Sequence, residues 1–273
     1  MLADLQSLEP GEHRIACPAC RRGPKDKTLG VTIQYDGGAV AHCFRCSYAE
    51  SFRPDRPPTI RPVAAPKRET LSEYGVEFFA ACTGLRATIG EQYLLARGCA
   101  IPPPDGDLRF HPALRHPVSD YTGPALIAMV THAVTRAPLT LHRSWIRADG
   151  RKASVDPSRM LLAGHSKRHG VIRLWPDESV TLGLCIAEGV ETALSAAHAF
   201  VPTWACVDAG NLATFPVLDG IESLTIAADN DQVGVGAAHE CARRWSAAGR
   251  EVRIAMASTN GVDLNDLVQE TAT

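Results

Sequence analysis

The stretch Leu182-Gly-Leu-Cys-Ile-Ala187 decides the fold, together with the Glu188-Gly189 that follows it. Its six residues form a short apolar run, which predicts a buried strand. Residues 190–200 then carry Ala, Leu and Glu, which favour a helix. The chain therefore contains a strand-to-helix unit with a carboxylate at the exit of the strand.

The same pattern returns further along the chain. Ser223-Leu-Thr-Ile-Ala-Ala228 is a second apolar run, and it ends in Asp229-Asn230-Asp231 before a Gly- and Ala-rich helix that begins near Val233. Residues 203–207 and 251–256 have the composition of two further strands. Repeated strand-to-helix units predict an α/β fold, with a parallel sheet flanked by helices.

Acidic residues follow both of the strands described first. In an open parallel sheet, functional groups collect outside the carboxyl ends of the strands, so we expect Glu188, Asp229 and Asp231 to converge there. Crowded carboxylates repel one another unless cations lie between them. Carboxylate oxygens suit Mg²⁺ or Mn²⁺, and the sequence therefore predicts a site for one of these ions.

Four of the nine cysteines form two CxxC pairs, Cys17-Pro-Ala-Cys20 and Cys43-Phe-Arg-Cys46. The interval between the pairs is that of a four-cysteine zinc ribbon, and it can form a β-hairpin across Gly37-Gly38. So small a module has little core, and zinc binding would supply the energy of folding. A disulfide is the alternative, and a cytosolic location disfavours it.

Charge is divided unevenly along the chain, although the total is only −2. Residues 1–70 carry 11 Lys and Arg against 8 Asp and Glu, residues 71–175 carry 13 against 8, and residues 176–273 carry 4 against 14. A basic region attracts a phosphate backbone, whereas an acidic cluster needs metal before it can approach the same polyanion. An ordinary scatter of surface charge is the alternative.

The organisation along the chain predicts four parts. We expect a zinc ribbon at 1–52, a Pro-rich basic linker at 53–70, a basic α+β subdomain at 71–178 and the parallel-sheet domain at 179–273. No apolar run approaches the roughly 18 residues of a membrane span, and no signal-like segment opens the chain. These features predict a cytoplasmic protein without a membrane partner.

A basic strand is expected in the α+β subdomain. Side chains alternate along an extended Leu141-His-Arg-Ser-Trp-Ile-Arg147, so Arg143, Trp145 and Arg147 share one face. Two guanidinium groups beside an indole could hold a phosphate and stack a base. An exposed basic face with a buried Trp at its centre is the alternative.

The motifs together resemble the Toprim domain of bacterial and phage DNA primases of the DnaG type. The resemblance lies in Glu188-Gly189 after a strand, Asp229-Asn230-Asp231 after a later strand, and Gly261-Val-Asp-Leu-Asn-Asp266 near the end, with the cysteine ribbon upstream. It is closest to phage and plasmid-borne primases, whose Toprim segment often reads as Glu188-Gly-Val-Glu-Thr-Ala193 does here. Glu191 takes a place that Asp often holds in the chromosomal enzymes.

The resemblance implies roles for individual acids. Glu188 would be the Toprim glutamate, which acts as a metal ligand or as the acid–base group of nucleotidyl transfer. Asp229 and Asp231 would be the metal-binding pair. Asp263 and Asp266 would close the site, with Asp263 as a further ligand of Mg²⁺ or Mn²⁺.

The resemblance also implies cofactors and partners. Zinc would be structural, in a ribbon that reads the template. Arg143, Arg147 and Lys152, the last within Gly150-Arg-Lys152-Ala153, would meet the template and the incoming nucleotide. The implied partners are a single-stranded DNA template, ribonucleoside triphosphates and a separate replicative helicase.

The activity that the resemblance implies is DNA-dependent synthesis of RNA primers by two-metal nucleotidyl transfer. A Toprim nuclease or topoisomerase would share the acids but cleave the nucleic acid. A zinc-ribbon adaptor that only binds nucleic acid is the non-catalytic alternative, and such a protein would have no need of Glu188, Asp229 and Asp231 together.

Overall fold

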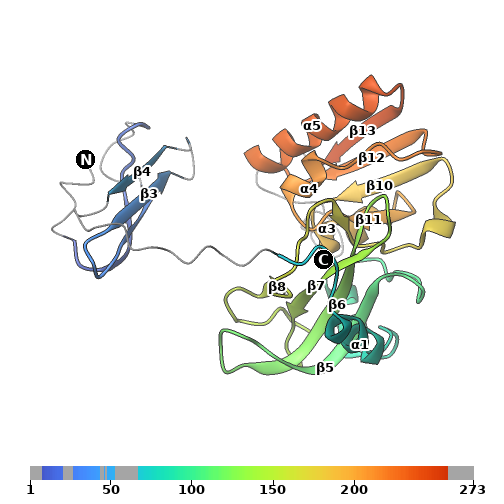
Figure 1. Ribbon diagram of the computed structural model, residues 1–273, viewed down its shortest axis with the longest axis horizontal. Coiled ribbons are helices and arrows are strands. Elements are labelled where there is room, and N and C mark those ends of the chain that lie inside the picture. Colours follow the sequence, from blue (N-terminus) through green and yellow to red (C-terminus); the bar gives the residue numbers. More distant parts are fainter. Residues whose placement is uncertain (1–7, 21–26, 44–45, 47, 53–66, 258–273) are drawn as a thin grey trace. The chain divides into compact units, whose positions relative to one another are not determined.

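The computed structural model describes residues 8–20, 27–43, 46, 48–52 and 67–257 (Figure 1). The chain divides into two compact units, Met1–Ala64 and Ala65–Thr273. Each unit has its own apolar core. Within the described residues, no helix is both long and apolar enough to cross a lipid bilayer.

The first unit is a four-stranded antiparallel sheet in the order β1-β2-β3-β4. Its strands are β1 (Gly11–Ile15), β2 (Leu29–Ile33), β3 (Ala39–Cys43) and β4 (Ala49–Phe52). The hairpin expected around Gly37-Gly38 is present, because β2 pairs with β3 and Gly37 takes the positive φ of 80° that the turn requires. Buried and exposed side chains alternate along β3, so one face of the sheet covers a small core.

The second unit begins with an antiparallel sheet in the order β5-β6-β7-β8, with β9 also paired to β6. Its strands are β5 (Leu108–Arg115), β6 (Thr122–His132), β7 (Pro138–Trp145), β8 (Arg159–Leu161) and β9 (Gly170–Val171). Two helices, α1 (Glu73–Ala81) and α2 (Ile89–Ala96), contact β6. β6 and β7 form an antiparallel hairpin, with Arg136 at positive φ in the turn between them.

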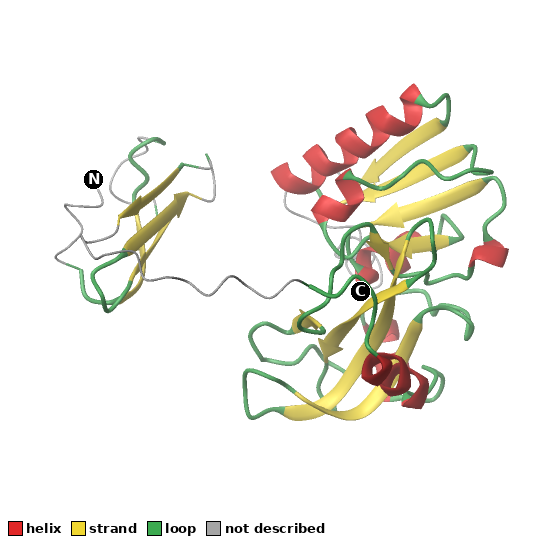
Figure 2. Ribbon diagram, in the orientation of Figure 1, coloured by secondary structure: helices red, strands yellow, loops and turns green. Residues whose placement is uncertain are grey.

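The parallel sheet predicted from the sequence follows, in the order β11-β10-β12-β13 (Figure 2). Every neighbouring pair of its strands is parallel. The strands are β10 (Gly183–Ala187), β11 (Thr203–Ala205), β12 (Ser223–Ala228) and β13 (Glu251–Met256); the helices are α3 (Val190–Ala196), α4 (Ala209–Ala213) and α5 (Gln232–Ala247), with a 3₁₀ turn, η2 (Asp177–Ser179), before β10. The predicted α/β fold is therefore confirmed.

Each face of the parallel sheet is covered. Ile186 and Ile226 lie in the same apolar cluster as Trp245 of α5, whereas Ala187 and Ala227 lie in the cluster that contains α3. Strands buried on both faces read as nearly continuous apolar runs, which is why the sequence pattern was so plain.

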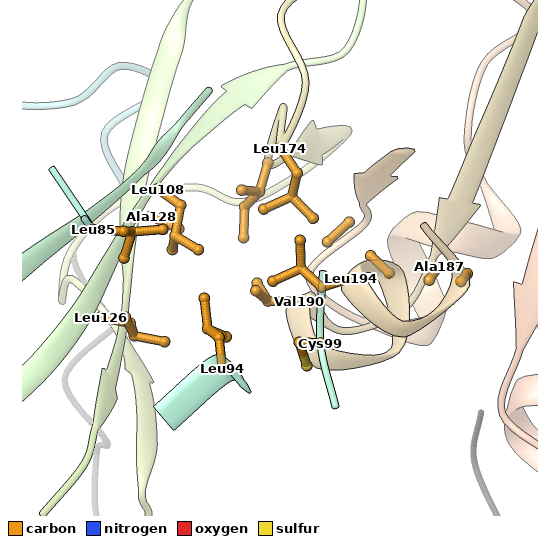
Figure 3. Packing of buried hydrophobic residues seen from close by; sticks show 14 of the residues in the cluster. Leu85, Leu94, Cys99, Leu108, Leu126, Ala128, Leu174, Ala187, Val190 and Leu194 are labelled. Carbon is orange, nitrogen blue, oxygen red and sulfur yellow. The ribbon is translucent and has the colours of Figure 1, made fainter. Parts of the chain in front are cut away.

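An apolar cluster joins the two sheets of the second unit. Val190 and Leu194 of α3 lie in it with Leu94 of α2, Leu126 of β6 and Leu174 (Figure 3). Burial of side chains of this size contributes about 1.5–3 kcal/mol each. This packing fixes the carboxyl ends of the parallel strands relative to the β7–β8 edge of the antiparallel sheet.

Candidate active site

A pocket of about 320 Å³ opens where the carboxyl ends of β10, β11 and β12 meet the β7–β8 edge. Its lining contains acids from the parallel-sheet region and cations from the preceding region. The charged residues of its lining are Glu188, Glu191, Asp208, Asp229, Arg97, Arg159 and Lys167. The pocket thus combines groups that bind cations with groups that bind anions.

Glu188 lies directly after β10, at the start of the turn into α3. Burial raises the pKa of its carboxyl group to about 7, and the negative charges of Asp229, Asp231 and Asp208 add to the rise. A hydrogen bond from the Ala209 backbone N–H opposes the shift. The acids are close enough to disfavour one another's charge, which is the electrostatic condition under which a divalent cation binds well.

Each of the two aspartates after β12 has a partner within the protein. Thr192 Oγ1 donates a hydrogen bond to Asp229 Oδ1 at 3.3 Å. Asp231 caps the N-terminus of α5, where its Oδ1 accepts from the Gly234 N–H at 2.7 Å. These contacts orient the acids before any ligand binds.

Asp208 is an acid of this pocket that the sequence analysis missed. It follows β11, caps α4 by accepting from the Asn211 N–H at 3.0 Å, and forms an ion pair with Lys167. The signal was present, since Asp208 comes directly after the predicted strand 203–207, as Glu188 and Asp229 follow theirs.

The donor set of the pocket is chemically suited to Mg²⁺ or Mn²⁺, because these ions prefer carboxylate oxygens. Within the described part of the chain, the four cysteines are the only group of three or more His, Cys, Asp or Glu side chains whose ligand atoms all lie within 4.8 Å of one another. The carboxylate oxygens of the acids are therefore further apart than the ligand atoms of a fully formed metal site. Side-chain movement would complete the coordination of a bound ion.

The basic face predicted for β7 needs a correction. Trp145 is fully buried, and its Nε1–H donates to the Leu114 carbonyl oxygen at 3.1 Å. The Arg143 guanidinium lies 5.3 Å from the centre of its ring and donates to the Leu161 carbonyl oxygen. Trp145 therefore cannot stack a base, and the alternative of a buried Trp is correct.

The pocket meets the opposite face of β7. His142 lines the pocket, and side chains alternate along a strand, so Arg143 and Trp145 point away from it. Arg147 lies beyond the end of β7 and pairs with Asp149 at 2.7 Å, while Lys152 is exposed. None of these predicted nucleic-acid contacts lines the pocket. Two further predicted acids, Asp263 and Asp266, lie outside the described residues.

The cysteines of the first unit form a tight cluster. The Sγ atoms of Cys17 and Cys46 are 3.7 Å apart, and those of Cys20 and Cys43 are also 3.7 Å apart. A tetrahedron with Zn–S distances of about 2.3 Å has edges of about 3.8 Å. The cluster therefore fits a structural zinc ion.

Two family models match the chain. A Toprim domain model matches residues 183–273, and a model described as a domain of unknown function (DUF7146) matches residues 69–174. The C-terminal part of the chain is therefore a Toprim domain, and the resemblance inferred from its acids is confirmed.

Solved primase structures are similar to the chain. A DNA primase domain from Pseudomonas aeruginosa has a TM-score of 0.46 at 12% identity, covering 72% of this chain and 74% of that one. The primase fragment of the bacteriophage T7 primase-helicase protein has 0.46 at 13% identity, covering 95% and 94%. The Aquifex aeolicus primase, with zinc-binding and RNA polymerase domains, has 0.45 at 12% identity, covering 98% and 79%. Comparison with curated proteins finds no match.

Proposed function

We propose that this protein is a DNA primase, which joins ribonucleotides into short RNA on a single-stranded DNA template. One observation carries the proposal: acids at the carboxyl edge of a Toprim sheet line one pocket together with Arg97, Arg159 and Lys167. Nucleotidyl transfer needs both kinds of group, because the metal ions bind to acids and the substrate is a polyanion.

The acids would hold the metal ions of the reaction. We assign Glu188, Asp229 and Asp231 as ligands of Mg²⁺ or Mn²⁺, with Asp263 as a further ligand. Bound there, the ions would neutralise charge on the phosphates and make the ribose 3′-hydroxyl more nucleophilic. Thr192 and the N-terminus of α5 orient Asp229 and Asp231 for this task.

Glu188 has the acid–base properties that the reaction uses. With a pKa of about 7, its carboxyl group can hold or release a proton near neutral pH. The efficiency of a general acid or base is greatest when its pKa lies near the working pH. Glu188 can therefore act as a ligand once it is ionised, or as the group that moves the proton of the attacking hydroxyl.

The remaining parts would bring the template to this pocket. We propose that the zinc ribbon contacts the template and that exposed cations of the α+β region, such as Arg147 and Lys152, bind its phosphates. The counts of charge agree, since the acids are concentrated after residue 175. A separate replicative helicase is the partner proposed to supply single-stranded DNA.

A primer-synthesis assay tests the proposal. The protein is incubated with single-stranded DNA, labelled ribonucleotides and Mg²⁺ or Mn²⁺, beside Glu188→Gln and Asp229→Asn. We expect products of a few nucleotides from the parent protein and none from either variant. Glu240→Gln, a change on the exposed face of α5, serves as the control and should remain active.

Other products would point to the alternatives. Cleavage of the template that depends on Glu188 would show a nuclease and overturn the primase proposal. Binding of DNA without synthesis or cleavage, under conditions where both metals are supplied, would leave a zinc-bearing nucleic-acid adaptor.

A further inference from the structure

Glu191 is more deeply buried than Glu188, Asp208 and Asp229, the other acids that line the pocket, and it is paired inside the protein. Its side chain is only 7% exposed, and its Oε1 accepts from Tyr93 Oη at 2.9 Å and from Arg159 Nη2 at 2.8 Å. Burial alone would raise the pKa of Glu191, but Arg159 and the hydrogen bond from Tyr93 outweigh burial and lower it. Glu191 is therefore a buried anion whose charge Arg159 compensates.

This pairing connects elements that are far apart in the sequence. Tyr93 belongs to α2, Arg159 opens β8, and Glu191 lies in the first turn of α3. Tyr93 is 2% exposed and lies in the cluster that joins the two sheets, so its hydroxyl group has a fixed position. A carboxylate held in this way limits the positions open to the guanidinium group that it binds.

Arg159 is the exposed member of the network. Its side chain is 39% exposed and lines the pocket, as do those of Arg97 and Lys167. A guanidinium group has several N–H donors in a planar fork, and those of Arg159 that bind neither Glu191 nor Tyr93 remain for a ligand. The fork matches the spacing of phosphate oxygens, and Glu191 would hold it in one orientation.

A second side chain near Arg159 can also bind a ligand. His142 lines the pocket, and the register of β7 with β8 places it opposite Leu161, two positions from the pair formed by Ser144 and Arg159 and on the same face of the sheet. Burial lowers the pKa of its imidazole to about 4, so it is neutral at working pH. Among the residues that the structure describes, its ring nitrogens have no hydrogen-bond partner. The ring is partly exposed, so these nitrogens are open to a ligand in the pocket.

We propose that Arg159 and His142 bind phosphate oxygens of the ribonucleoside triphosphate, and that Glu191 and Tyr93 are positioning residues that hold Arg159 in place for this contact. The inference rests on the proposed function for the identity of the substrate. It separates two glutamates of one segment: Glu188 serves the metal side of the pocket, and Glu191 serves the phosphate side.

Binding of inorganic tripolyphosphate, measured by calorimetry in the presence of Mg²⁺, tests the contact itself. Loss of one charge-assisted contact should weaken binding about tenfold in Arg159→Ala, and His142→Ala should weaken it less, because a neutral donor is lost. Arg253→Ala removes an exposed arginine of β13 and should bind as the parent does. Equal binding by Arg159→Ala and the parent would overturn the inference.

The positioning role needs a readout that simple destabilisation does not produce. Glu191→Gln and Tyr93→Phe should each raise the Kd for tripolyphosphate by about threefold to tenfold, since the fork loses its anchor. Added to Arg159→Ala, neither change should weaken binding further, because nothing is left to position. Independent effects in the double variants would contradict the positioning role, as would unchanged binding in both single variants.

In the primer-synthesis assay, the same changes should raise KM for the ribonucleotide more than they lower kcat. Tyr93→Phe keeps the buried ion pair and provides the test if Glu191→Gln does not fold, with thermal melting as the check. A chain that binds tripolyphosphate as described but makes no primer would refute the proposed function and leave the phosphate site standing. Primer synthesis with an unaltered KM in Arg159→Ala, Glu191→Gln and Tyr93→Phe would instead refute the phosphate site and leave the proposed function standing.

Discussion

The cysteine cluster and the acid cluster are two candidate metal sites built on different principles. The cysteines touch mainly one another, with sulfur atoms 3.7 Å apart in two pairs. The acids instead have protein partners: Asp208 pairs with Lys167, Asp229 accepts from Thr192, and Asp231 caps a helix. The first arrangement is closed and suits a structural ion, whereas the second leaves oxygens that can rearrange around metal and substrate.

The two metal ions would also differ in how much they contribute to folding. The core of the first unit consists of small and medium-sized side chains around its sheet, such as Val31 and Ala41, so a metal ion would contribute much of its folding energy. The second unit has two apolar clusters on its parallel sheet and does not depend on an ion to fold. The most sensitive tests therefore remove the ligands of one metal site and measure the folding of both units.

Loss of the zinc site should give the largest effect. Cys43→Ser should lower the zinc content from about one ion per chain to near zero and unfold the first unit, because structural zinc contributes on the order of 10 kcal/mol. All four tryptophans of the chain lie in the second unit. Tryptophan fluorescence should therefore stay native while proteolysis within residues 8–52 increases.

A matched change supports the interpretation of that experiment. Cys82→Ser alters a buried cysteine of the second unit and should leave the zinc content unchanged. If Cys43→Ser retained zinc, or if its loss also unfolded the second unit, the contrast between the two sites would be wrong.

Removal of the Glu188 charge should abolish activity but stabilise the metal-free protein. The pKa of Glu188 rises from the ordinary 4.5 to about 7 on folding, so its favourable contribution is complete below pH 4.5 and is lost as the pH rises through 7. Glu188→Gln cannot ionise, and its melting temperature without metal should exceed that of the parent at pH 8 but match it at pH 4.5. Primer synthesis should fall about a hundredfold or more.

Added Mg²⁺ should reverse that order. The ion should raise the melting temperature of the parent at pH 8 and have little effect on Glu188→Gln, because a ligand that binds only the folded state stabilises it. A variant less stable than the parent at pH 8 without metal would show that Glu188 is not held in a repulsive acidic environment.

A smaller effect should come from the helix that supports the aspartates. A Cβ atom at Gly234 would lie 2.6 Å from the Asp229 backbone oxygen and 3.2 Å from Asp229 Cβ. Gly234→Ala should therefore displace Asp229, destabilise the protein by about 1–3 kcal/mol and reduce Mg²⁺ affinity. Denaturant unfolding and metal titration by calorimetry measure the two effects.

Gly236 of the same helix provides the control. An added Cβ atom there meets nothing within 4 Å. Gly236→Ala should stabilise the protein by up to about 1 kcal/mol through helix propensity and leave metal binding unchanged. Similar losses of metal affinity in both variants would show that the contact with Asp229 is not the cause.

Patterns of neighbouring residues in the sequence were enough to predict the parallel strands and the cysteine cluster. β10 and β12 are apolar runs followed directly by acids, and the bounds predicted for β12 and β13 agree with the structure. The cysteine cluster follows from the spacing of two CxxC pairs. Burial of a strand is visible in a few consecutive residues, and a four-cysteine zinc site is visible in two copies of one short motif.

The phosphate side of the pocket could not be found in that way. Alternation along β7 shows that Arg143 and Trp145 share a face, but only the tertiary packing shows that His142 faces the pocket. Tyr93 and Glu191 are 98 positions apart and meet because the two sheets share one core. Local sequence contains no signal for such a pair.

The account depends on divalent metal binding among the acids at the carboxyl edge of the Toprim sheet. Crystals of the protein soaked in Mn²⁺, with diffraction data collected at the manganese absorption edge, test this most directly. The account predicts an anomalous peak coordinated by both Glu188 and Asp229. Manganese bound elsewhere on the protein, with no peak at these two carboxylates, would contradict it.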